Sequence, residues 1–125
     1  LPLIFMTAAG IAISDSIAYD GENMFEAIAG VSEPLRVKPL FWIRPPDRPG
    51  YNGDNDPDLA IRKGSYKLLM DFDGTNLQLY DIVKDAAESN NLAGELPGTV
   101  AELKAALHDW YHQYPHTIDT TKITY

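Results

Sequence analysis

The clearest structural signals of this sequence lie in LAIRKGSYKLLMDFDGTNLQLYDI, residues 59–82. It contains three segments rich in branched and aromatic residues, which pack well on a pleated sheet, at 59–62, 65–72 and 76–82. Lys63-Gly64 and Asp73-Gly74 separate them, and Asp-Gly between two such segments is a strong hairpin signal. Because tight turns join antiparallel strands, this stretch predicts an antiparallel meander.

One more strand is predicted upstream, at 39–44 (PLFWIR), which gives a four-stranded antiparallel sheet. The segment 45–58 that connects it to the meander is rich in Pro, Gly, Asp and Asn. It is the longest irregular segment between two predicted strands. Long loops of this kind are more often functional than tight turns.

A helix is predicted downstream of the strands. Thr99 is a favourable N-cap residue, and Glu102, three residues later, completes a capping box. Apolar residues then recur at helical spacing, at Val100, Leu103, Leu107, Trp110 and Tyr114. Pro115 ends the helix. Since an apolar stripe must lie on an apolar surface, we expect the helix to pack on the sheet, which makes the fold class α+β.

The beginning of the chain is more apolar. It predicts a helix at 2–9 followed by Gly10, and a short helix at 23–29 that is capped by Asn23. A helix that is apolar all round needs covering on more than one side, so we expect this chain to be a piece of a larger protein. The apolar run is shorter than the about 20 residues of a membrane span, and we expect no membrane partner.

Charge and composition exclude several kinds of protein. The 125 residues hold 10 Lys+Arg against 18 Asp+Glu, a net charge of −8, and no cysteine. Nucleic-acid binding rests on neutralisation of phosphates by Lys and Arg, so a nucleic-acid partner is not expected. Without cysteine there is no disulfide, no thiolate zinc site and no cysteine nucleophile.

Two patterns come close to metal sites without completing one. His108 and His112 have the i, i+4 spacing of helical metal ligands, but no third ligand is fixed, and we interpret them as solvated side chains. Asp54, Asp56 and Asp58 alternate as in a calcium loop, yet Leu59 and Ser65 stand where the loop needs Gly and Glu. We therefore expect no metal site in this segment.

An ordered series of short motifs runs through residues 1–114. The motifs are LPLI (1–4) with AAGI (8–11), DGENM (20–24), LFW (40–42), AIRKGSYKL (60–68), LYDI (79–82) with NNLA (90–93), and AEL (101–103) with Trp110. In this order they resemble the carboxyl-terminal part of sulfatases, which are arylsulfatase-like members of the alkaline phosphatase superfamily. The departures are Leu3 for the usual Thr, Ile43 for the usual acidic residue and Ala86 for the usual Pro.

The resemblance implies a division of the chain. Residues 1–35 resemble the end of a larger α/β catalytic domain with its connector, and residues 36–125 the carboxyl-terminal subdomain. The parent is expected to hydrolyse sulfate esters with a formylglycine nucleophile beside a calcium ion, both upstream. The segment 32–36 matches S-x-P-x-R, the core of the formylglycine site, but the rest of that motif is missing and we interpret it as connector. No catalytic residue is expected in this segment, which alone should be inactive.

The loop after the first strand is the predicted substrate-binding region, for a sulfated substrate such as a sugar. Arg44 and Arg48 offer planar donors for sulfate oxygens, and Trp42 and Tyr51 offer ring faces. The alternative is that both arginines pair with aspartates of the same loop.

The other expected partner is the upstream catalytic domain, and the apolar first helix predicts that the isolated segment self-associates. Two other readings stay open: a stand-alone binding or interaction module, and the carboxyl-terminal part of a phosphoesterase of the same superfamily. The family is compatible with a periplasmic or extracellular parent, although no signal peptide is visible in these residues.

Overall fold

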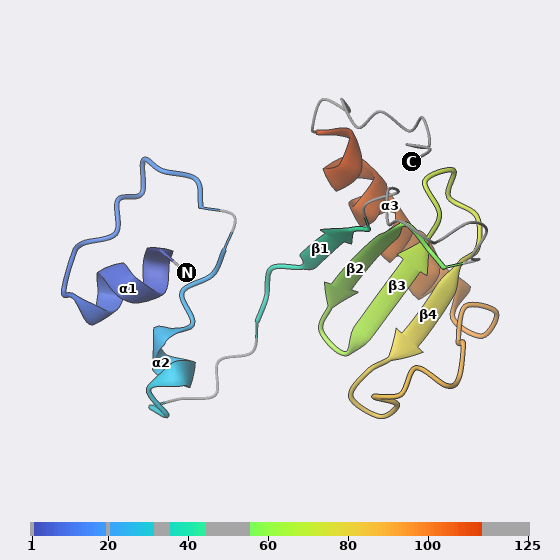
Figure 1. The fold of residues 1–125 in the computed structure, drawn as a ribbon, viewed down its shortest axis with the longest axis horizontal. Helices are drawn as coiled ribbons and strands as arrows, with labels where there is room; N and C mark the ends of the chain where they lie inside the picture. The colour runs from blue at the N-terminus through green and yellow to red at the C-terminus, as the bar shows by residue number, and fades with distance from the viewer. Residues whose placement is uncertain (1, 20, 32–35, 45–55, 114–125) are drawn as a thin grey trace, which may run out of the picture. The chain divides into compact units, whose positions relative to one another are not determined.

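The computed structural model describes residues 2–19, 21–31, 36–44 and 56–113. The chain divides into two compact units, Leu1–Lys38 and Pro39–Tyr125. We call them unit 1 and unit 2 and describe each by itself (Figure 1).

Unit 2 is built on a four-stranded antiparallel sheet. Its strands follow one another in the order β1-β2-β3-β4 (Figure 1), with bounds Leu40–Ile43, Leu59–Lys63, Tyr66–Met70 and Gln78–Asp81. The predicted α+β class and meander are therefore confirmed.

Glycines make both tight turns of the meander. Gly64 between β2 and β3 has a φ of 60°, and Gly74 between β3 and β4 has a φ of 78°. Glycine adopts this left-handed region without the steric cost that other residues incur. A Cβ at Gly74 would also stand 3.0 Å from Lys104 Nζ, which donates a hydrogen bond to the Gly74 carbonyl at 2.8 Å.

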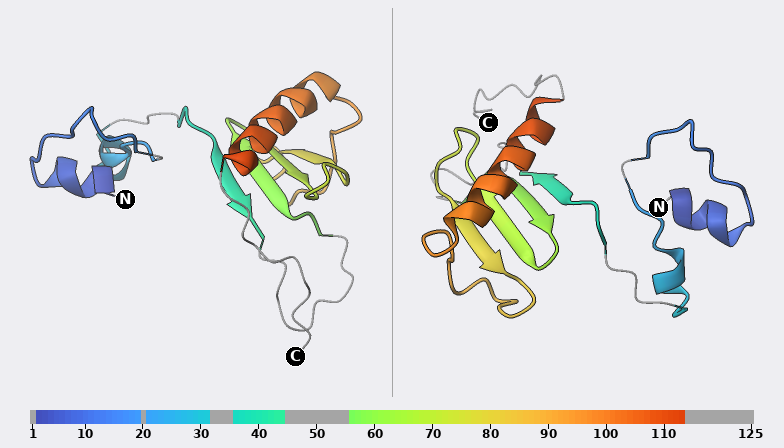
Figure 2. Two further views of the ribbon diagram at one scale, coloured as in Figure 1. Left: turned by 90° about the horizontal axis from the view of Figure 1, so that it is seen from above. Right: turned by 180° about the vertical axis from the view of Figure 1, so that it is seen from behind.

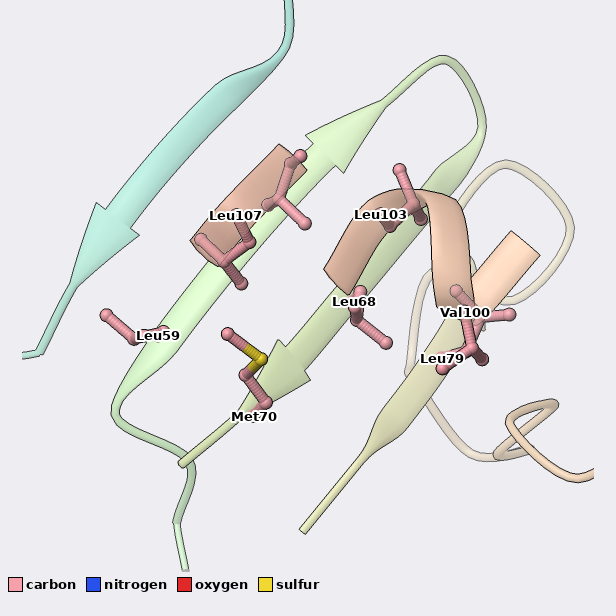
Figure 3. Close-up of a cluster of buried hydrophobic side chains, with 8 residues drawn as sticks. Leu59, Leu68, Met70, Leu79, Val100, Leu103 and Leu107 are labelled. Carbon is pink, nitrogen blue, oxygen red and sulfur yellow. The ribbon is translucent and has the colours of Figure 1, made fainter. Parts of the chain in front are cut away.

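The helix α3 (Pro97–His112) crosses one face of the sheet (Figure 2). Its apolar stripe packs into a core with alternate residues of β2, β3 and β4 (Figure 3), made up of Leu59, Ile61, Leu68, Met70, Leu79, Val100, Leu103 and Leu107. Phe41 of β1 stacks on Trp110 with ring centroids 4.8 Å apart. Tyr114, the last residue of the predicted stripe, lies outside the described residues.

The predicted capping box at the start of this helix is wrong. The helix begins three residues earlier, at Pro97, and its N-cap residue is Leu96, which makes no side-chain capping bond. Proline is well suited to the first helical position because its φ is already helical and it has no N–H to satisfy. Glu102 does not cap but pairs with Lys63 Nζ at 2.7 Å.

Unit 1 holds two short helices, α1 (Pro2–Ala8) and α2 (Phe25–Ile28). The residue at the N-cap of α2 is Met24 rather than Asn23, although the Asn23 side chain accepts a hydrogen bond from the Phe25 N–H at 3.1 Å. Leu3 is the one buried hydrophobic side chain among the residues described in this unit, whereas Phe5 is 66% exposed. None of the helices described here has the length and apolarity needed to cross a bilayer.

Candidate functional site

The two faces of the sheet in unit 2 have different chemistry. Because side chains alternate along a strand, the residues between the core positions point away from α3. The strand register places Trp42, Ala60, Leu69 and Gln78 in one row across this face. The next row holds Leu40, Arg62, Lys67 and Tyr80. The face opposite α3 thus combines two aromatic rings and three aliphatic side chains with two cations.

This face bears a groove of about 680 Å³. Parts of β1, β2 and β3 line it together with residues 57–58 and residues of the loop between 82 and 88, and we call it the sheet groove. Ala60 is buried at its floor although α3 lies on the other face. The groove is the candidate functional site, because concave surfaces with a few convergent polar groups are where ligands bind.

The structure places two of the four predicted site residues in this groove. Trp42 is 45% exposed and lines it, a large ring that packing does not cover. Arg44 follows β1, and its guanidinium lies 3.5 Å from a carboxylate oxygen of Asp56 and donates to the Asp56 carbonyl at 3.3 Å. The predicted surface pairing is therefore present for Arg44. Arg48 and Tyr51, the other two predicted residues, lie outside the described residues.

A charged pair forms another wall of the groove. Lys67 Nζ on β3 lies 2.6 Å from Glu88 Oε1, and the two side chains are 26% and 30% exposed. Glu88 has a φ of 53°, a left-handed conformation that costs a non-glycine residue about 1–2 kcal/mol. Such a residue persists only where its surroundings fix it.

Side chains of the same loop supply that fixation. One carboxylate oxygen of Asp85 accepts hydrogen bonds from the backbone N–H groups of Ser89 and Asn90, both at 2.8 Å. Asp81 is buried, accepts from the Val83 N–H at 3.3 Å and pairs with Lys84. The loop that presents Glu88 is therefore held to the end of β4 by polar contacts.

Tyr80 lies next to this pair on β4. It is buried, and its hydroxyl donates to the Gln78 side-chain oxygen at 3.0 Å. Burial first, and then the negative charges of Glu88 and Asp85, raise the pKa of Tyr80 above its usual value of 10.0. The phenol is therefore neutral at physiological pH.

Sequence reasoning missed the residues that line the groove from β2 and β3. Arg62 and Lys67 face each other across the β2–β3 hairpin, on the face opposite the buried Ile61 and Leu68. The alternation of side chains along the two strands, together with the turn at Gly64, could have predicted from the sequence that Arg62 and Lys67 share a face. The ion pair with Glu88 carried no such signal, since 21 residues separate the partners.

The resemblance implies a calcium ion and a formylglycine residue for the parent protein, both outside this segment. Within the described part of the chain, no group of three or more His, Asp or Glu side chains could hold a metal ion. His108 and His112 lie with ring centroids 4.1 Å apart on α3. Of segment 32–36 only Arg36 is described, and its Nε lies 3.7 Å from Glu22 and donates to the Lys38 carbonyl at 3.1 Å.

Comparison with known proteins finds the fold of this chain in solved structures. No family model and no curated protein matches this chain. Among solved structures it is similar to two crystal structures of Ps i-CgsB, one of them in complex with k-i-k-neocarrahexaose. Each match has a TM-score of 0.63 and 24% sequence identity, and covers 86% of this chain but 22% of the other. The chain therefore has the fold of the part of Ps i-CgsB that it matches, and it spans less than a quarter of the length of these structures.

Proposed function

We propose that this chain is the carboxyl-terminal part of a sulfatase and that unit 2 frames the substrate of the longer enzyme. The observation that carries the proposal is the fold shared over 86% of the chain with Ps i-CgsB, a carrageenan sulfatase. The ordered motifs from residue 1 to residue 114 support the same family independently of the backbone.

The division of labour follows from the residues that are present. Sulfate ester hydrolysis by this family uses a formylglycine nucleophile beside calcium, and the described residues offer no ligand set for that ion. The chemistry would therefore reside in an upstream catalytic domain. Unit 1 leaves large apolar side chains such as Phe5, Ile28 and Val31 exposed, and contact with that domain would bury them.

The groove supports a saccharide as the substrate class. An exposed indole such as Trp42 offers a flat apolar surface to the apolar face of a sugar ring. The Arg44 guanidinium, which lines the same groove, supplies planar donors for sulfate oxygens, and the Asp56 side chain that pairs with it is 64% exposed. Arg48 and Tyr51 belong to the same proposal. The complex of Ps i-CgsB with a neocarrahexaose is consistent with a sugar substrate.

The experiment is an assay of sulfate release by two proteins, the 125-residue chain and the longer natural protein that contains it. Sulfated oligosaccharides, a small aryl sulfate and a small aryl phosphate are the substrates. We expect the longer protein to release sulfate and the 125-residue chain to release none. Release of phosphate without sulfate would instead identify a phosphoesterase. A natural protein without a catalytic domain would identify a stand-alone binding module.

A further inference from the structure

The cations of the sheet groove differ in how they are neutralised. Arg44 pairs with Asp56, and Lys67 pairs with Glu88. Arg62, on β2 between them, is exposed and lines the groove. Within residues 2–19, 21–31, 36–44 and 56–113, no side chain forms a hydrogen bond or ion pair with its guanidinium. Arg62 therefore contributes a positive charge that the described protein does not neutralise.

Arg62 and Trp42 belong to the same binding surface. Arg62 is paired with Leu40 in the strand register, and Trp42 is two residues further along β1 on the same face. Diagonal neighbours of this kind are about 7–8 Å apart at the backbone, within reach of long side chains. A sugar ring on the Trp42 indole would thus have the Arg62 guanidinium beside it, with Ala60 and Leu69 beneath.

The charge of Arg62 selects the kind of ligand. The whole chain carries a net charge of −8, so an anion approaching most of its surface is repelled. A guanidinium is always charged and binds oxyanions with two parallel hydrogen bonds. The neighbouring ammonium of Lys67 is already held at 2.6 Å by Glu88, so it competes weakly for the same anion.

We propose that Arg62 binds a sulfate ester of the saccharide substrate other than the one that is hydrolysed, while Trp42 contacts the sugar ring that carries it. This inference rests on the proposed function, which it deepens by assigning a second anionic group to the substrate. A carboxylate on the sugar has related chemistry, and the choice of probes separates the two.

The test is calorimetric titration of the 125-residue chain with three six-unit oligosaccharides: sulfated neocarrahexaose, the same sugar after desulfation, and a carboxylated oligogalacturonate. We expect the sulfated sugar to bind with the highest affinity. Loss of one charge-assisted hydrogen-bonded contact should weaken its binding by about tenfold or more in Arg62→Gln, and Arg62→Lys should recover part of the loss.

Lys63→Gln is the matched control. Lys63 is the next residue on β2, points to the other face of the sheet and pairs with Glu102 on α3. Its replacement removes the same charge from the chain without touching the groove, so we expect sulfated-sugar binding within about twofold of the parent. Because Arg62 is exposed, both variants should retain the far-ultraviolet circular dichroism of the parent.

The outcomes separate this inference from the function on which it rests. Four results overturn the role of Arg62, even if the longer protein releases sulfate. Two concern the variants: unchanged binding in Arg62→Gln, or equal losses in Arg62→Gln and Lys63→Gln. Two concern the probes: equal affinity for the sulfated and desulfated sugars, or no binding of any probe. Preference for oligogalacturonate also overturns it, in favour of a carboxylate. Sulfate-selective binding through Arg62 in the 125-residue chain, together with a longer protein that releases no sulfate, supports the binding role of Arg62 and overturns the sulfatase proposal.

Discussion

Replacing Glu88 tests whether the wall of the sheet groove is held by its ion pair. Lys67 and Glu88 approach to 2.6 Å and are each about one-quarter to one-third exposed, at 26% and 30%. The matched pair is Lys63–Glu102, with a similar distance of 2.7 Å but exposures of 48% and 63%. A charged hydrogen bond shielded from water contributes about 1.5–3 kcal/mol, whereas an exposed pair contributes about 0–1 kcal/mol.

We take a value between these limits for Glu88 because its pair is only partly shielded. Glu88→Gln should lower the free energy of unfolding by about 1–2 kcal/mol and Glu102→Gln by less than about 1 kcal/mol. In a domain of this size 1 kcal/mol corresponds to a fall in Tm of about 4–8 °C. Urea unfolding followed by circular dichroism measures both variants, and a double-mutant cycle with Lys67→Met isolates the pair.

The left-handed backbone of Glu88 adds a second, independent expectation. Glu88→Ala loses the ion pair and keeps a side chain at a φ of 53°, whereas Glu88→Gly loses the pair but relieves the strain. We therefore expect the glycine variant to be more stable than the alanine variant by up to about 1 kcal/mol. A role of the Lys67–Glu88 pair in stability is contradicted if Glu88→Gln lowers the free energy of unfolding by no more than Glu102→Gln does. Strain at Glu88 is contradicted if Glu88→Ala is more stable than Glu88→Gly.

Three further predictions concern the core, the pH dependence and the assembly. Leu107 is fully buried between α3 and the sheet, so Leu107→Ala should cost about 2–5 kcal/mol in urea unfolding, and an effect below 1 kcal/mol would mean that α3 does not cover the core. The pKa of Tyr80 is raised in the folded state, so the fold should lose stability as pH rises through 10.0 toward that higher pKa. Tyr80→Phe should remove this loss in thermal melts at pH 9 to 11. A pH profile of Tm that the substitution leaves unaltered would contradict the prediction. Because unit 1 exposes Phe5 and other large apolar side chains, the 125-residue chain should form dimers or larger species in sedimentation, and deletion of residues 1–11 should reduce them. A strictly monomeric chain that the deletion leaves unchanged would contradict this expectation.

The sheet was predictable because each of its signals is local. Gly64 and Gly74 mark turns that need positive φ, and alternation in residues 59–82 assigns the faces. The start of α3 was not predictable from capping preference alone. Thr99 satisfies the capping-box pattern, but Pro97 already has a helical φ and the helix extends back to it.

The site was predictable only in part, for a physical reason. Trp42 and Arg44 adjoin the segment that the sequence predicts to be a long loop, and both line the groove. Arg62 and Lys67 become neighbours only when β2 and β3 pair, and Lys67 contacts Glu88 only when the loop after β4 folds back. Polar residues on the outer face of a strand look solvated in sequence, and long-range pairing alone distinguishes a groove wall from a solvated surface.

The most direct test of a substrate-framing role for unit 2 compares two substrates in the longer enzyme carrying Arg44→Ala, with Lys63→Ala as the control. If unit 2 frames a sulfated saccharide, KM for the sulfated oligosaccharide should rise by about tenfold or more through loss of a charged hydrogen bond, while hydrolysis of a small aryl sulfate should stay unchanged. Kinetics equal to the parent on both substrates, with the fold intact, would contradict a framing role, as would equal losses on both.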